Sequence, residues 1–137
     1  MSIVIDASVT LAWLYPDEIT DAVRDVFDLV TNNGAVVPSL WRLEVANGLT
    51  LAVRKRRITP AFRAGALADL AFAPVVIDTE TDLHAWNAAL QLADRFGLTT
   101  YDAAYLELAH RRSLPLATLD TALRAAAQAL GIPLMGV

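Results

Sequence analysis

Short apolar runs recur along this chain between longer stretches in which apolar residues return with a helical period. Four runs, residues 2–5, 35–37, 74–77 and 116–118, are almost wholly apolar, and residues 132–135 form a weaker fifth. Continuous apolar runs of this length are typical of strands that are buried on both faces of a parallel sheet. The pattern therefore predicts four strands, with a fifth near the end of the chain.

The stretches between these runs predict helices, several with recognisable start or stop signals. Ser8 or Thr10 is expected to cap the first helix, Thr59 followed by Pro60 opens another, and Gly97 ends one. Alternation of short strands with helices is typical of an α/β fold. We expect a single domain over residues 1–137, a three-layer α/β/α sandwich with a mostly parallel sheet of four or five strands. The other helices are predicted over residues 20–31, 40–56, 83–96, 101–112 and 121–130.

Composition narrows the class of protein further. Hydrophobic residues make up 55% of the 137 residues and charged residues only 19%, which excludes a disordered chain and leaves apolar surface for a partner. No apolar run approaches the roughly 18 residues of a membrane span. The beginning of the chain lacks the basic segment of a signal peptide, so we expect a cytoplasmic protein without membrane contact. The absence of cysteine excludes disulfides and thiolate metal sites.

The net charge of −4 taken alone argues against a nucleic-acid partner, but the charges are unevenly distributed. Arg54, Lys55, Arg56 and Arg57 are consecutive and form a local basic stretch. This stretch is a candidate for RNA binding through phosphate contacts. The alternative is a solvated helix end whose cations face the negative end of the helix dipole.

Acidic side chains stand at the points where the predicted strands end or helices begin. Asp6 follows the first strand, Asp120 follows the fourth, and Asp102 lies at the start of a helix. In an open parallel sheet, ligands bind outside the carboxyl ends of the strands. Each acid has a structural alternative when taken singly, because aspartate is a favoured helix cap and Glu44 can be an ordinary helical glutamate. Together they predict one acidic site.

Several carboxylates at one place repel each other, and a divalent cation relieves that repulsion. Oxygen ligands, without cysteine or paired histidines, favour Mg²⁺ or Mn²⁺ over zinc. Such a site can hold one or two ions that activate water and stabilise the oxygens of an in-line displacement at phosphorus. The predicted chemistry is metal-dependent cleavage of a phosphodiester.

Four segments in this order resemble the PIN-domain ribonucleases, and most closely the toxin component of bacterial VapBC toxin-antitoxin pairs. They are residues 3–8 (IVIDAS), 43–47 (LEVAN), 100–105 (TYDAAY) and 117–120 (ATLD). The order and spacing of the four segments carry the resemblance, which covers nearly the whole chain.

The resemblance implies a metal-dependent endoribonuclease that cuts single-stranded or looped RNA with Mg²⁺ or Mn²⁺. It also implies a homodimer and an antitoxin protein whose tail covers the active-site groove. Ser8 and Thr118 are implied as supporting hydroxyls. The four candidate acids, which the resemblance implies to be catalytic and metal-binding, are Asp6, Glu44, Asp102 and Asp120.

A few further residues carry weaker expectations. Asn47 lies three positions after Glu44, on the same face of a helix, and is a candidate lining residue. The three tryptophans can stack on bases, but packing in the core or in an interface is the preferred interpretation. They are Trp13, Trp41 and Trp86.

Other classes of function remain as alternatives. The fold and acids can survive in a catalytically silent module whose role is protein complex formation. A receiver-like phosphorylation switch is also an α/β domain with clustered acids, but it needs a lysine after a late strand, and the only lysine here is Lys55. A phosphatase with two aspartates one residue apart fits poorly, because Asp6-Ala7-Ser8 supplies only one.

Overall fold

The computed structural model describes residues 2–137 and contains one five-stranded sheet. Its strands lie in the order β3-β2-β1-β4-β5, and every neighbouring pair is parallel. The predicted sheet of four or five strands is therefore confirmed, with all pairs rather than most pairs parallel. The strands are β1 (Ile3–Ile5), β2 (Ala35–Val37), β3 (Val75–Ile77), β4 (Leu116–Ala117) and β5 (Leu134–Met135).

Helices occupy the stretches between the strands, as the periodic pattern predicts. Gly34, with φ of 81°, ends the second helix in a conformation that favours glycine. A short 3₁₀ helix, η1, spans Pro16–Glu18. The α-helices are α1 (Ala7–Leu14), α2 (Asp21–Asn33), α3 (Trp41–Arg54), α4 (Pro60–Leu70), α5 (Thr81–Ala85), α6 (Ala88–Phe96), α7 (Thr100–Arg112) and α8 (Thr121–Ala129).

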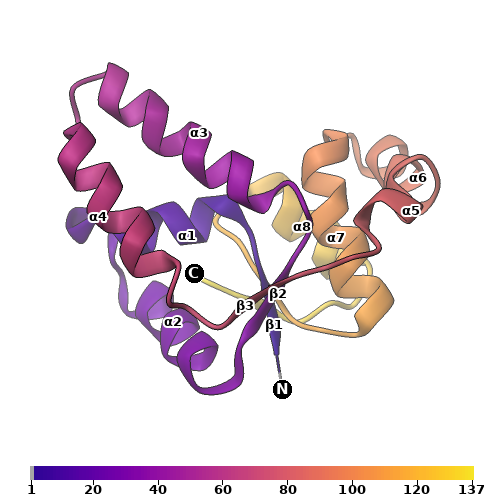
Figure 1. The fold of residues 1–137 in the computed structure, drawn as a ribbon. Coiled ribbons are helices and arrows are strands. Elements are labelled where there is room, and N and C mark those ends of the chain that lie inside the picture. Colours follow the sequence, from indigo (N-terminus) through magenta and orange to yellow (C-terminus); the bar gives the residue numbers. More distant parts are fainter. Residues whose placement is uncertain (1) are drawn as a thin grey trace.

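The helices form two layers that enclose the sheet (Figure 1). Helices α1 to α4 pack on one another on one side, while α5 to α8 gather on the other, with α7 against β1 and β4. This arrangement is the expected α/β/α sandwich. Among residues 2–137, no helix combines the length and apolar character that a bilayer crossing requires.

The central strand β1 is fully buried, and its carboxyl end lies beside the carboxyl end of β4. Ile5 is paired with Ala117 of β4, so the residues after these two strands emerge side by side. Asp6 and Thr118 are those residues. The topology therefore joins segments more than 100 positions apart at one end of the sheet.

The start of α1 differs from the prediction. Asp6, rather than Ser8 or Thr10, caps this helix by accepting a hydrogen bond from the Val9 backbone N–H at 3.1 Å. Thr10 is buried instead, where its hydroxyl donates to the Asp6 carbonyl oxygen and accepts from the Trp41 indole N–H. The strand ends one residue before the helix begins, which leaves only Asp6 at the cap position.

The single helix predicted over residues 83–96 is wrong, because the structure has two helices there. Helix α5 ends at Ala85, and Asn87 leaves helical geometry with φ of −125° and ψ of −105° before α6 begins. The apolar period continues across the break and conceals it. Leu83 and Trp86 fit that period, but neither is buried: Leu83 is 70% exposed and Trp86 is 94% exposed.

The three tryptophans have different environments. Trp13 stacks on Phe27, with ring centroids 4.3 Å apart, and Trp41 is buried, which confirms the packing prediction for both. Trp86 is exposed and does not pack in the core. For this residue, packing in an interface with a partner stays a prediction.

Candidate active site

The first candidate acid, Asp6, is held at the carboxyl end of β1 by hydrogen bonds to both of its carboxylate oxygens. Its Oδ1 accepts from the Ser8 hydroxyl at 2.6 Å and from the Val9 N–H at 3.1 Å, while Oδ2 accepts from the Thr118 hydroxyl. The side chain is buried, with 5% exposed. These donors satisfy the carboxylate that burial would otherwise leave uncompensated.

Thr118 and Ser8 connect the end of β1 to the segment after β4. The fully buried Thr118 hydroxyl accepts from the Asp120 N–H at 3.0 Å. The Ser8 hydroxyl accepts from the Leu119 N–H, also at 3.0 Å. Both residues therefore hydrogen-bond to Asp6 and to the turn that carries Asp120, and their supporting role in a site stays a prediction.

Asp120 and Asp102 each lie in the first turn of a helix or directly before it. Asp120 caps α8 by accepting from the Leu123 N–H at 2.8 Å through Oδ2. Asp102 lies in the first turn of α7, where the Thr99 hydroxyl accepts from its backbone N–H at 3.1 Å. The partial positive charge at each helix start favours a carboxylate there.

Glu44 reaches the site from the first turn of α3 and is half-buried. Its Oε1 accepts a hydrogen bond of 2.6 Å from the hydroxyl of Tyr105 on α7. Sequence reasoning missed Tyr105. The signal that could have found it is its position three residues after Asp102, on the same face of the helix.

Charge repulsion links all four candidate acids. Burial raises the pKa of Asp6, and the charge of Asp102 adds to this, while hydrogen bonds from Ser8, Thr118 and Val9 act in the opposite direction. Burial raises the pKa of Glu44 above its ordinary value, against a lowering hydrogen bond from Tyr105, and the charges of Asp102 and Asp6 raise it further.

Asp102 completes the set. Burial raises its pKa, and the charge of Asp120 raises it further, against a lowering hydrogen bond with Thr99. Because every member of the set acts on at least one other, the acids form a single electrostatic cluster. Such a cluster at the carboxyl ends of β1 and β4 attracts a cation.

The donor set fits a hard divalent cation. Within residues 2–137, no group of three or more His, Cys, Asp or Glu side chains lies close enough together to hold a metal ion. Mg²⁺ usually binds through one or two carboxylates and completes its shell with water and substrate phosphate oxygens. This mode of binding does not require a closed protein cage. A cluster of carboxylates that repel each other matches it.

The remaining predicted residues lie further along α3 and just beyond its end. Asn47 is exposed on α3, one turn after Glu44. The basic stretch at the end of α3 is also exposed, but Arg57 is already occupied, since its guanidinium pairs with Glu18 at 2.7 Å and lies over the Tyr15 ring. Three cations of the stretch, Arg54, Lys55 and Arg56, have no ion pair in the described part of the chain.

A groove extends to the basic stretch from residues that neighbour Asp6 and Asp120 in the chain, although none of the four candidate acids lines it. It has a volume of about 400 Å³ and runs between α1 and α3. Ser8 and Leu119 line one part of it, while Lys55 and Arg57 line another. Gly48 belongs to its wall, and a Cβ at this position would lie 2.5 Å from Leu11 Cδ1.

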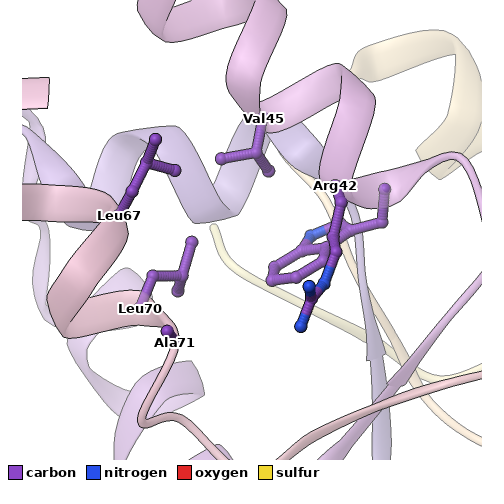
Figure 2. A pocket seen from close by; sticks show the side chains of 6 residues that line it. Arg42, Val45, Leu67, Leu70 and Ala71 are labelled. Atoms are coloured by element: carbon purple, nitrogen blue, oxygen red, sulfur yellow. The ribbon is translucent and has the colours of Figure 1, made fainter. Parts of the chain in front are cut away.

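A second hollow lies between α3 and α4 and is apart from the acids (Figure 2). Val45 and Leu67 approach it from the two helices, with Leu70 and Ala71 below and Arg42 beside it. Its volume is about 220 Å³. Because no carboxylate lines it, this hollow lacks the chemistry of the acidic cluster.

Comparisons with known proteins agree with the fold. The model of the PIN domain family matches residues 3–129. No match is found among curated protein sequences. The structure is similar to that of PAE2754 from Pyrobaculum aerophilum, with 25% identity, a TM-score of 0.68 and coverage of 92% of this chain and 84% of that one.

Two further solved structures share the fold at lower sequence identity. FitAcB from Neisseria gonorrhoeae has 16% identity and a TM-score of 0.65, and the match covers 96% of this chain and 95% of that one. VapBC2 from Rickettsia felis, bound to a DNA fragment from its promoter, has 14% identity and a TM-score of 0.64, with coverage of 98% and 97%.

Proposed function

The chain belongs to the PIN domain family, and we propose that it is an endoribonuclease that cleaves single-stranded or looped RNA with Mg²⁺ or Mn²⁺. PIN domains are in general nucleases. The observation that supports this proposal most is the electrostatic cluster of the four candidate acids at the carboxyl ends of β1 and β4. Mutual repulsion disfavours such a cluster of carboxylates unless a cation offsets it.

In this proposal the four candidate acids hold the cation, and Ser8 and Thr118 fix the orientation of Asp6. The cation, when bound, supplies positive charge that activates water and stabilises the oxygens around phosphorus. Cleavage joins the oxygen of water to phosphorus while the bond to the leaving oxygen breaks. The buried hydrogen bonds to Asp6 keep its carboxylate in place before substrate arrives, so little reorganisation is needed during the reaction.

The RNA strand is proposed to follow the groove between α1 and α3. This groove connects the surroundings of Ser8 with Lys55, so a strand whose scissile phosphate lies at the acids can contact the basic stretch. Cations along a backbone groove are typical of single-strand binding. Arg57 contributes least, because Glu18 and Asp17 already neutralise it.

We further propose that the protein is the toxin of a type II toxin-antitoxin pair, a homodimer, and silenced by an antitoxin protein. The sequence resemblance to VapBC toxins and the shared fold with VapBC2 support this role. Large apolar side chains that lie exposed in the single chain also favour protein partners. Phe72 is 90% exposed, and Leu43, next to Glu44, is 75% exposed.

The test uses purified protein free of any partner and a fluorescent, mixed-sequence single-stranded RNA, with DNA of the same sequence alongside. Cleavage is measured with Mg²⁺, with Mn²⁺, with chelator, and in Asp102→Asn. Asp28→Asn, an exposed acid on α2, is the matched control. We expect RNA cleavage that requires metal, falls at least 100-fold in Asp102→Asn and is unchanged in the control.

Two outcomes would contradict the proposal. Cleavage that persists in chelator, or that Asp102→Asn leaves intact, would exclude the acidic cluster as the active site. No cleavage under any condition would favour the catalytically silent module, whose role is protein complex formation.

A further inference from the structure

We propose that Tyr105 is a positioning residue that holds the Glu44 carboxylate toward the other three acids. This inference rests on the proposed function, because it concerns how the same site is assembled. Its basis is the hydrogen bond of 2.6 Å that the Tyr105 hydroxyl donates to Glu44 Oε1, between residues 61 positions apart.

Glu44 needs an external restraint more than Asp6 and Asp120 do. Asp6 and Asp120 are each fixed by a backbone N–H at a helix start, at 3.1 Å and 2.8 Å. Glu44 has a longer side chain with more freely rotating bonds, and within residues 2–137 the Tyr105 hydroxyl is the only group that donates a hydrogen bond to it. Repulsion from Asp6 and Asp102 also pushes its carboxylate away from the cluster.

Tyr105 has the rigidity that this restraint requires. Tyr105 is 1% exposed and belongs to the buried hydrophobic core. A tyrosine has only two rotatable side-chain bonds, and burial of its hydroxyl is costly unless a partner accepts its proton. The position of the hydroxyl is therefore fixed by the core, and Glu44 adapts to it.

The hydrogen bond also spans a gap between elements. Helices α3 and α7 share few other contacts, although each carries one of the acids. Asp102 lies three residues before Tyr105 on α7, on the same helical face. Tyr105 thus relates the Glu44 carboxylate on α3 to the Asp102 carboxylate on α7.

The test is Tyr105→Phe, which removes one oxygen and retains the ring. Tyr101→Phe is the matched control, since Tyr101 is on the same helix but 64% exposed. Three quantities are measured: the melting temperature, the affinity for Mn²⁺ alone by calorimetry, and kcat and KM for single-stranded RNA. Groups that orient metal ligands typically change metal affinity or activity by about 10- to 100-fold when they are removed.

We expect Tyr105→Phe to remain folded, to bind Mn²⁺ at least about tenfold more weakly, and to lose a similar factor in kcat with little change in KM. The same variant is then made in a Glu44→Ala background. In that background Tyr105→Phe should cause no further loss of Mn²⁺ affinity. An effect that acts through Glu44 disappears when Glu44 is absent, which is what a double-mutant cycle detects.

Wild-type Mn²⁺ affinity in Tyr105→Phe, or an equal loss with and without Glu44, would overturn the inference. If the wild-type protein binds Mn²⁺ but cuts no RNA, the proposed function fails while the binding cycle still decides the role of Tyr105. If the wild-type protein neither cuts RNA nor binds Mn²⁺, both fail. Should Tyr105→Phe not fold, Glu44→Asp withdraws the carboxylate from the hydroxyl by one methylene, and wild-type Mn²⁺ affinity there overturns the inference.

Discussion

Asp6 shows how a single residue can serve both the fold and the candidate site. It caps α1 through Oδ1, and the same carboxylate is held by the hydroxyls of Ser8 and Thr118 at the end of the sheet. Asp120 likewise caps α8 while it faces the cluster. The structural and functional interpretations of these aspartates, which compete when the sequence is considered alone, are therefore compatible.

Removing one charge from the cluster should stabilise the metal-free protein. Burial and the charge of Asp120 raise the pKa of Asp102, so at neutral pH the fold retains a carboxylate in its disfavoured charged form. Asp102→Asn is expected to raise the melting temperature by about 3 °C at pH 7 in chelator. Differential scanning calorimetry measures this shift.

The pH dependence of that shift has a definite sign. The pKa of Asp102 in the folded protein lies above its unfolded value of about 4, so the stability due to the neutral carboxyl is present below pH 4 and lost as pH rises. The melting-temperature advantage of Asp102→Asn should be small at pH 4 and largest at pH 7. An advantage that grows toward acid pH would contradict this explanation.

At the scale of elements, local signals in the sequence predicted the parallel sheet and most helices. They also predicted that three aspartates lie at the carboxyl end of this sheet. Strand pairing at Ile5 and Ala117 made that part of the site predictable, because carboxyl ends of parallel strands meet. The break at Asn87 and the contact between Tyr105 and Glu44 were not predictable. The first lies within an unbroken apolar period, and the second depends on how α3 and α7 face each other.

A buried ion-pair group that the sequence did not signal connects α7 to the segment after β3. Arg111 donates to Asp78 at 2.7 Å and to Glu107 at 2.8 Å, and both carboxylates are buried. Burial alone would raise the pKa of Asp78, but the hydrogen bonds and charge of Arg111 hold it below its usual value. The pair positions α5 beside α7, away from the candidate acids.

Arg111→Met should be strongly destabilising, because it leaves two buried carboxylates without a counter-charge. Loss of one partner from a buried pair costs about 3–5 kcal/mol, so we expect the melting temperature to fall by about 10 °C or more. Arg112→Met, at the exposed neighbouring position, is the control and should shift it little. Similar melting temperatures for the two variants at pH 7 would show that the ion pair contributes no stability.

At the scale of the whole molecule, a net charge of −4 coexists with a proposed RNA substrate. The distribution of charge resolves this conflict. Acids gather at the carboxyl end of the sheet, where the proposed cation would offset them, and Lys55 of the basic stretch lines the groove that also contacts Ser8 and Leu119. Local fields, rather than the summed charge, decide where a phosphate backbone binds.

Replacement of Arg54, Lys55 and Arg56 by glutamine should weaken RNA binding and reduce its dependence on salt. Each lost phosphate contact lowers the slope of log affinity against log salt by about 0.7 for a single strand, so a loss of up to about 2 is expected. Fluorescence anisotropy at several salt concentrations measures it. The control replaces Arg24, Arg95 and Arg112, which changes the net charge equally, and an equal loss there would exclude a local binding role.

The central claim is that Asp6, Glu44, Asp102 and Asp120 form one divalent-cation site. The most direct test is anomalous X-ray diffraction from crystals of the protein with Mn²⁺, which locates the ion independently of any activity. We predict one or two anomalous peaks among these four carboxylates. Ordered Mn²⁺ elsewhere, for example beside Asp78 and Glu80, or no peak at saturating Mn²⁺, would contradict the claim.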